Sequence, residues 1–144
     1  SRVVKNIMSK DLEESLELSV DWNKLSKAAA SSDGLVPVAV QDIDSKELIL
    51  VAYINELAFK ESIQKKMLIL WSSSRNELWI KGESSGNTFD LIEAYVNCEQ
   101  NSFLFKVRPK KKGICHTKNK YGDPRNCYYR QIDFETLALK NIDL

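Results

Sequence analysis

Residues 35–66, which read LVPVAVQDIDSKELILVAYINELAFKESIQKK, decide the fold. Two short runs rich in Val and Ile, residues 35–40 and 48–54, are separated by an acidic, turn-forming stretch, and this predicts two strands joined by a turn. Asn55 then predicts the N-cap of a helix over residues 56–66. The buried side of this helix is expected to carry Leu57, Ala58, Ser62 and Ile63, and its outer side Glu56, Lys60, Gln64 and Lys65.

Further strands are predicted downstream, at residues 67–71, 78–81, 89–98 and 103–107, with turns between them. The first thirty residues scatter apolar side chains through an acidic stretch, which predicts a helical N-terminal region. We find no internal repeat, low-complexity tract or Pro/Gly/Ser-rich linker. The sequence therefore predicts an α+β fold, a β-rich single domain over residues 1–144 with short, mostly antiparallel strands and an N-terminal helix.

Composition and charge exclude several classes of protein. Of the 144 residues, 43% are hydrophobic and 28% charged, with only 5 Gly and 3 Pro, so a disordered or collagen-like chain is excluded. Because 21 basic and 20 acidic residues leave a net charge of +1, nucleic acid is not an expected partner. The longest apolar run, residues 48–54, is shorter than the ~20 residues that cross a bilayer. Residues 1–18 lack a signal-peptide pattern, and we expect a cytoplasmic protein with no membrane segment.

Three cysteines, Cys98, Cys115 and Cys127, are the first candidates for chemistry. Their odd number, without an export signal, argues against a disulfide framework. No Cys-x-x-Cys pair is present, so three thiolates could instead hold a catalytic zinc ion, with a water in the fourth position that ionises near pH ~7. Alternatively, Cys98 is a buried strand residue and the other two share no role. The spacing leaves both interpretations open.

His116 is the single histidine and stands next to Cys115. An imidazole with an ordinary pKa near ~6.5 can transfer protons at neutral pH, and beside a metal ligand it could also be a fourth ligand. A lone histidine is also often a satisfied surface or core residue.

Residues 71–86 combine tryptophans, hydroxyls, cations and a glycine-containing turn. This set suits a phosphorylated planar ligand, because hydroxyls and amides bind phosphate oxygens, a cation neutralises charge and an aromatic face stacks on a ring. The alternative is a polar hairpin with core tryptophans. The candidate ligand-binding residues are Trp71, Ser72, Ser74, Arg75, Trp79, Lys81, Glu83, Ser84, Ser85 and Gly86.

Five cations lie within residues 106–112, KVRPKKK. Such a run favours a solvated strand end, phosphate binding near the cysteines, or weak contact with RNA.

Several short motifs occur in a fixed order along the chain. They are GLVP (34–37), QD (41–42), AYINE (52–56), WSSSR (71–75), LWIKGESSG (78–86), CHT (115–117) and CYYR (127–130). Over about residues 30–132 the chain resembles the phosphoribosyl-AMP cyclohydrolase family, whose signatures include the Trp-x-Lys-Gly-Glu-x-Ser-Gly string and the Cys-His-Thr triplet.

The resemblance implies both an assembly and a reaction. Family members are intertwined homodimers with two active sites at the subunit interface. Their zinc is held by three cysteines from both chains, here Cys98, Cys115 and Cys127. A zinc-bound hydroxide attacks C6 of the adenine ring of phosphoribosyl-AMP and the N1–C6 bond opens, a step of histidine biosynthesis, with His116 as the proton shuttle. The candidate residues between 71 and 86 would hold the phosphoribosyl groups of this small-molecule substrate.

Two features depart from the family pattern. The family usually carries Asp-Cys-Asp-x-Asp, which binds magnesium, whereas Cys98 here stands among Asn97, Glu99 and Asn101. Hard Mg²⁺ favours carboxylates, so magnesium binding at this position is left open. The loop at residues 118–126 is also longer than the family's arginine-rich turn.

Two alternatives to the cyclohydrolase are kept, of which the first follows from these departures and the second from the basic run. One is a diverged paralogue that hydrolyses or deaminates another purine-like nucleotide, although the His-x-Glu and Pro-Cys-x-x-Cys signature of zinc deaminases is absent. The other is a non-catalytic, zinc-stabilised module that binds RNA through residues 106–112.

Overall fold

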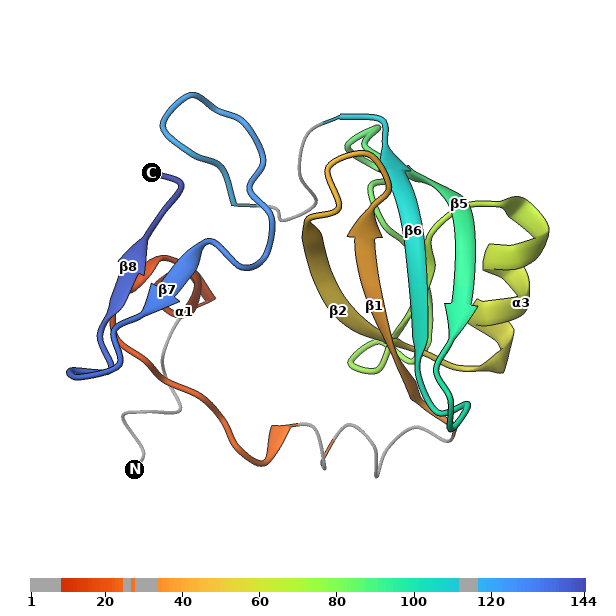
Figure 1. The fold of residues 1–144 in the computed structure, drawn as a ribbon, viewed down its shortest axis with the longest axis horizontal. Helices are drawn as coiled ribbons and strands as arrows, with labels where there is room; N and C mark the ends of the chain where they lie inside the picture. The colour runs from red at the N-terminus through yellow and green to blue at the C-terminus, as the bar shows by residue number, and fades with distance from the viewer. Residues whose placement is uncertain (1–8, 25–26, 28–33, 112–116) are drawn as a thin grey trace.

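The computed structural model of this chain describes residues 9–24, 27, 34–111 and 117–144. Its centre is a four-stranded sheet in the order β2-β1-β6-β5 (Figure 1). The sheet strands are β1 (Val36–Asp42), β2 (Leu48–Ile54), β5 (Phe89–Val96) and β6 (Phe103–Pro109). The β1–β2 and β5–β6 pairs are antiparallel, as predicted, but β1 and β6 pair in parallel and join the two hairpins into one sheet.

The helix predicted after the second strand is confirmed as α3 (Glu56–Lys65). Asn55 is its N-cap, and the side-chain oxygen accepts a 2.9 Å hydrogen bond from the amide of Ala58. Ala58 and Ser62 are fully buried as expected. The expectation for Leu57 and Ile63 was wrong, since they are 50% and 42% exposed. Each lies 100° around the helix from its buried neighbour, and the buried stripe is narrower than predicted.

The hydrophobic core lies between one face of the sheet and a layer formed by α3 and a hairpin of β3 (Ile69–Ser72) and β4 (Glu77–Ile80). The Ser62 hydroxyl is buried and bonds both the carbonyl (2.8 Å) and the amide (3.1 Å) of Ile69, which fixes α3 to β3. Phe59 of α3 stacks on Phe103 of β6 with ring centroids 4.7 Å apart. None of the helices in the described part of the chain has the length and hydrophobicity that a membrane crossing requires.

The two ends of the chain meet beside β2, in a part we call the terminal module (residues 9–16 and 117–143). It contains α1 (Ser9–Glu14) and a short antiparallel hairpin of β7 (Arg130–Ile132) and β8 (Leu139–Asn141) (Figure 1). The amide of Leu139 donates to the carbonyl of Leu16 (2.9 Å), so the N-terminal segment and the C-terminal hairpin are joined directly.

The prediction of a helical region over the first thirty residues was wrong for residues 15–20, which have no helix. Carbonyls that would continue α1 accept hydrogen bonds from the C-terminal segment instead. The Arg130 guanidinium donates to the carbonyls of Leu12 and Ser15 at 2.8 Å each. The Ser15 hydroxyl also accepts from the amide of Glu17, a local turn that competes with helix.

Candidate active site

Cys98 and Cys127 belong to opposite edges and opposite ends of the sheet. Cys98 follows β5, one edge strand, at the N-terminal end of β6, where Val96 pairs with Phe103. The amide of Cys127 donates to the carbonyl of Ile49 (3.1 Å) in β2, the other edge strand, near the C-terminal end of β1. With strands about 4.8 Å apart and a rise of about 3.3 Å per residue, the two positions are on the order of 20 Å apart.

This separation decides how the cysteines can act. Two sulfurs that bind one zinc ion, each about 2.3 Å from it, lie within about 4 Å of one another. Cys98 and Cys127 of one chain therefore cannot bind the same ion. Cys98 is exposed in the turn after β5, so the alternative in which it is a buried strand residue was wrong. Cys127 is also exposed, and neither residue is in a disulfide.

Cys115 and His116 lie outside the described residues. The chain resumes at Thr117, which is buried and accepts a 3.1 Å hydrogen bond from the amide of Arg125. Lys118 forms a bridge with Pro124. The loop at residues 118–126 therefore closes on itself and returns the chain to its starting point shortly before Cys127.

Residues 81–86 form a loop at the C-terminal end of β6. The Lys111 ammonium donates to the carbonyl of Ser85 (3.1 Å), and its amide donates to the Asn87 side chain (2.6 Å). Ser84, Ser85 and Gly86 are exposed. The loop thus presents hydroxyls at the end of the sheet where Lys111 leads into residues 112–116.

Gly82 allows this loop to close. Its φ of +83° is left-handed, and a Cβ there would lie 1.8 Å from the carbonyl oxygen of Asn87. We expect Gly82→Ala to lower the free energy of unfolding by about 3 kcal/mol, from left-handed strain plus a collision with backbone. Gly122→Ala is the matched control, because its φ is +81° with nothing within 4 Å, and it should cost about 1 kcal/mol. Urea unfolding of both variants measures the difference, and equal losses would contradict the collision.

Residues 72–75 form the tip of the β3–β4 hairpin, and the structure does not place them beside residues 81–86. Ser72 pairs with Glu77 at the tip, whereas Ile69 pairs with Ile80 at the other end, where the loop begins. The two groups are therefore separated by the hairpin's length, about 10 Å. At the tip, Arg75 donates to the Ser72 hydroxyl (3.3 Å), and Ser72 also contacts Ser74.

The candidate residues thus divide into two sets. We call residues 81–86 with Cys127 the loop half-site, because Lys111 contacts Ser85 and also lines a cavity with the neighbours of Cys127. We call residues 72–75 with Cys98 the tip half-site, since both lie toward the opposite end of the sheet (Figure 1). Each half-site holds one described cysteine and one cluster of hydroxyls with a cation.

The two tryptophans are part of both interpretations made from the sequence. Trp71 and Trp79 are partly buried and pack against the core, as a hairpin with core tryptophans requires. The Lys81 ammonium nevertheless lies 4.7 Å from the Trp79 ring centroid, which holds a cation at the start of the loop half-site.

The turn after β5, where the family carries its acidic motif, is closed by amide side chains. The Asn97 side-chain oxygen accepts from the amides of Asn101 and Ser102 at 2.9 Å each, and its nitrogen donates to the Asn101 side-chain oxygen at 2.6 Å. The two side-chain oxygens that could bind a cation, those of Asn97 and Asn101, therefore both accept hydrogen bonds within the turn. Glu99 is exposed and supplies the single carboxylate. These residues do not fit a magnesium site.

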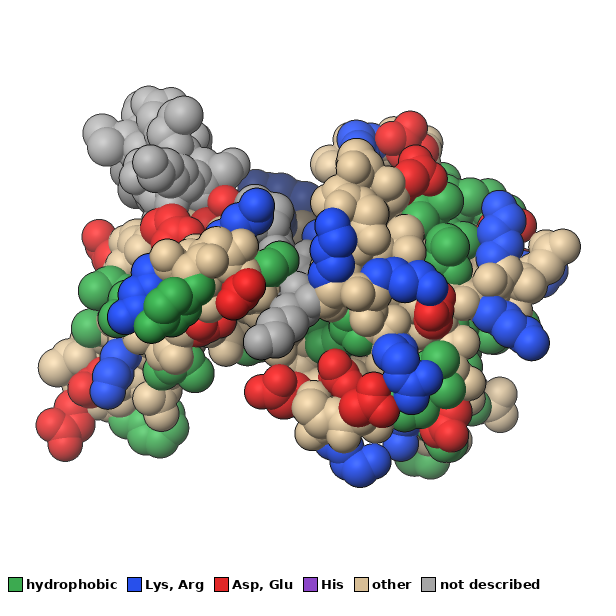
Figure 2. All heavy atoms as spheres, turned by 90° about the horizontal axis from the view of Figure 1, so that it is seen from above, with side chains coloured by type: hydrophobic (Ala, Val, Ile, Leu, Met, Phe, Trp, Pro, Cys, Tyr) green, Lys and Arg blue, Asp and Glu red, His purple; other side chains and the backbone are tan. Residues whose placement is uncertain are grey.

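The basic run at residues 106–112 does not form a patch in its described part. Lys106 lies over the Tyr95 ring, Arg108 pairs with Asp44 (3.0 Å), and Lys110 pairs with Asp90 (3.0 Å). The Arg108 hydrogen bond holds the pKa of the Asp44 carboxyl below its usual value. On the face that Figure 2 shows, Lys and Arg side chains are interspersed with Asp and Glu rather than gathered. This arrangement does not favour RNA contact.

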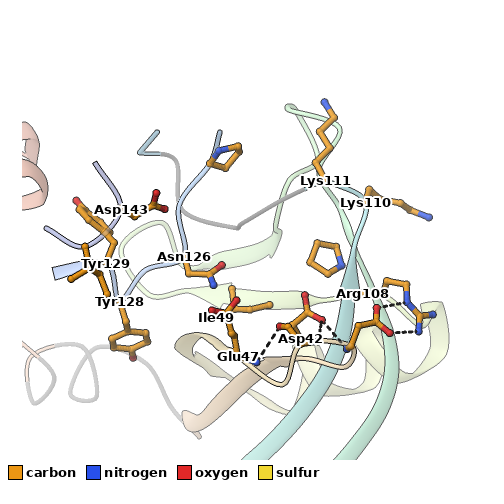
Figure 3. Close-up of a pocket in the computed structure, with 15 residues that line it drawn as sticks. Asp42, Glu47, Ile49, Arg108, Lys110, Lys111, Asn126, Tyr128, Tyr129 and Asp143 are labelled. Carbon is orange, nitrogen blue, oxygen red and sulfur yellow. Dashed lines mark hydrogen bonds and ion pairs between the residues drawn. The ribbon is translucent and has the colours of Figure 1, made fainter. Parts of the chain in front are cut away.

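A cavity of about 790 Å³ separates the terminal module from the sheet (Figure 3). Asn126 and Tyr128, on either side of Cys127, line it together with Ile49 and Lys111. Burial raises the pKa of the Tyr128 hydroxyl, and the electrostatic effect of the neighbouring Cys127 adds to this. Sequence reasoning assigned no role to Asn126 or Tyr128, although the CYYR motif contains the tyrosine.

Comparisons with known proteins agree with the order of motifs. A family model described as phosphoribosyl-AMP cyclohydrolase matches residues 50–129. A curated phosphoribosyl-AMP cyclohydrolase of Desulfotalea psychrophila is 39% identical over 102 residues, 71% of this chain and 76% of that protein. One from Caulobacter vibrioides is 36% identical over 135 residues, 93% of this chain and 88% of that protein. The resemblance inferred from the motifs is confirmed.

Proposed function

Since the chain belongs to the phosphoribosyl-AMP cyclohydrolase family, we propose that it opens the N1–C6 bond of the adenine ring of phosphoribosyl-AMP by hydrolysis, as a step of histidine biosynthesis. The observation that supports this proposal most is the division of the candidate residues into the loop half-site and the tip half-site. Neither half-site has three thiols, and Cys98 and Cys127 of one chain lie too far apart to bind one zinc ion.

A homodimer resolves this division. In the proposed assembly, the tip half-site of one subunit meets the loop half-site of the other, which produces two identical sites related by a two-fold axis. Both edges of the sheet carry exposed apolar side chains that such a contact would cover. On β2 they are Leu48 and Val51, and on β5 they are Ile92, Tyr95 and Val96, each between 42% and 49% exposed.

The cysteines fit a zinc ion in this assembly but not in a single chain. Cys98 would come from one subunit, and Cys115 with Cys127 from the other. Cys98 and Cys127 are both exposed, so each thiol is accessible to a metal ion that it shares with a second chain. Held by three thiolates, a zinc ion would have one position open for water, and the chemistry it would supply there is a water molecule with a pKa near ~7.

The other residues bind and orient the substrate. The hydroxyls of Ser84 and Ser85, with Lys81, suit one phosphate, and Arg75 with the Ser72 hydroxyl suits the other. His116, next to Cys115 in sequence, would give a proton to the ring nitrogen as the bond opens. A ring carbon of an amidine is a poor electrophile at neutral pH, so protonation of this nitrogen lowers the barrier.

A turnover assay with metal analysis tests the proposal. We expect about one zinc per chain after desalting, and an absorbance change when phosphoribosyl-AMP is added. Cys127→Ser should lose both zinc and at least 10²-fold in turnover, because a site with two thiolates binds the ion poorly. Gln64→Ala, at an exposed position of α3, serves as control and should keep both.

Two other results would replace the proposal. Stoichiometric zinc without consumption of phosphoribosyl-AMP would indicate a paralogue that acts on another purine-like nucleotide, and a nucleotide screen would follow. A protein without zinc and without turnover, but with salt-sensitive RNA binding, would indicate the non-catalytic module.

A further inference from the structure

Arg125 is a buried charged residue two positions before Cys127. Its side chain is 6% exposed, and Tyr129, two positions after Cys127, is 4% exposed. The guanidinium lies 4.6 Å from the Tyr129 ring centroid, so these two residues pack on one another and Cys127 lies on the chain between them.

The Arg125 guanidinium joins three segments that are far apart in sequence. It donates to both carboxylate oxygens of Glu14 at 3.0 and 3.2 Å, and to the carbonyl of Asp143 at 2.7 Å. Nη1 makes both contacts with Glu14 and Nε makes the contact with Asp143, so two nitrogens of one rigid planar group hold the two segments. A buried guanidinium that loses its carboxylate is strongly destabilised, so this contact holds the segment in one position.

Other bonds hold the same segment to the N-terminal helix. The Tyr129 hydroxyl donates to the carbonyl of Glu13, and Arg130 donates to the carbonyls of Leu12 and Ser15. All of these partners lie outside residues 50–129, the part of the chain that the family model matches. The chain's own terminal segments therefore support a residue of the proposed site.

We propose that Arg125 is a positioning residue for Cys127, and that its contacts with Glu14 and Asp143 hold the Cys127 thiol where zinc is bound. We call the contacts of Arg125 with Glu14 and Asp143 the Arg125 clamp. The clamp is observed in the structure, whereas the metal that it would serve rests on the proposed function. Residues that orient metal ligands typically affect metal affinity 10- to 100-fold. The clamp ties zinc affinity to a helix at the start of the chain.

The test compares zinc affinity by chelator competition in the full-length protein. We expect Glu14→Gln and Arg125→Ala to weaken zinc binding about 10-fold or more. Arg125→Lys should lie in between, since a lysine keeps the charge but has one nitrogen, which cannot replace both Nη1 at Glu14 and Nε at Asp143. Glu56→Gln is the matched control, because Glu56 forms an exposed ion pair with Lys60 (3.2 Å), and it should bind zinc like the wild type.

A second readout keeps the test decisive if a variant misfolds or if the protein holds no zinc. Alkylation of metal-free protein, followed by mass spectrometry, should label Cys127 at least threefold faster in Glu14→Gln than in the wild type. Cys98, in the same molecule, should react at an unchanged rate. If the wild-type protein bound no zinc, the proposed metal would be rejected, but the alkylation rates of Cys127 and Cys98 could still be compared between the variant and the wild type. Unchanged Cys127 labelling together with unchanged zinc affinity in Glu14→Gln would overturn the clamp.

Discussion

Mixing Cys98→Ser protein with Cys127→Ser protein should produce activity that neither variant has alone. Each variant homodimer lacks one thiol in both of its sites. In a mixed dimer, the Cys127→Ser subunit still supplies Cys98, and the Cys98→Ser subunit still supplies Cys115 and Cys127. One complete site results. Random exchange makes half of the dimers mixed, so we expect about a quarter of wild-type turnover and of wild-type zinc content.

The expectation depends directly on the sheet. Cys98 follows the edge strand β5 and Cys127 docks on the edge strand β2, at the opposite end, on the order of 20 Å away. A site formed within one chain would require these thiols to meet, which would require the sheet to come apart. Two intact chains satisfy the requirement without any change in fold.

A mixture of Cys115→Ser and Cys127→Ser protein is the matched control. Both thiols are assigned to the same subunit of a site, so every site in the mixed dimer lacks one of them and activity should stay absent. Subunit exchange is measured separately, with differently tagged chains. Activity in both mixtures, or in neither despite exchange, would reject the proposed division of the cysteines between subunits.

The part of the fold that could be predicted from the sequence is the part built from local patterns. The apolar runs at residues 35–40 and 48–54 are separated by turn-forming residues, which marks two strands. Asn55 caps the helix that follows through a hydrogen bond with Ala58, only three residues away. The parallel pairing of β1 with β6 has no local signal, since it joins residues more than sixty positions apart and is fixed by core packing. The short β7–β8 hairpin depends on bonds such as that from Leu139 to Leu16.

The candidate site shows the same limit. Residue types in the motifs identified the cysteines, hydroxyls and cations, but the division into two half-sites depends on which end of a hairpin each residue occupies. Arg125 had no signal in the sequence, because arginine is usually exposed and only the folded termini bury it.

Changing both Asn97 and Asn101 to Asp should make the stability of the protein depend on a divalent cation. In the wild type, the Asn97 side chain donates to Asn101 at 2.6 Å and accepts from two backbone amides, so the turn is closed without an ion. Two aspartates at these positions replace a donor–acceptor contact with two facing carboxylates, while Glu99 adds a third nearby in sequence. We expect a loss of about 1–2 kcal/mol in the free energy of unfolding when EDTA is present.

Millimolar Mg²⁺ should restore most of that loss in the double variant and leave the wild type unchanged, because carboxylates supply the oxygen ligands that Mg²⁺ prefers. Urea unfolding with EDTA or with Mg²⁺ measures both effects. The single variant Asn101→Asp is the control: Asn97 can still donate to the new carboxylate, so the turn stays closed and Mg²⁺ should have little effect. If Mg²⁺ stabilised the wild type as much as the double variant, the idea that the hydrogen bond between Asn97 and Asn101 takes the place of a bound cation would be rejected. The expected contrast would show that the two amides close the turn beside Cys98 as a cation would close it between carboxylates.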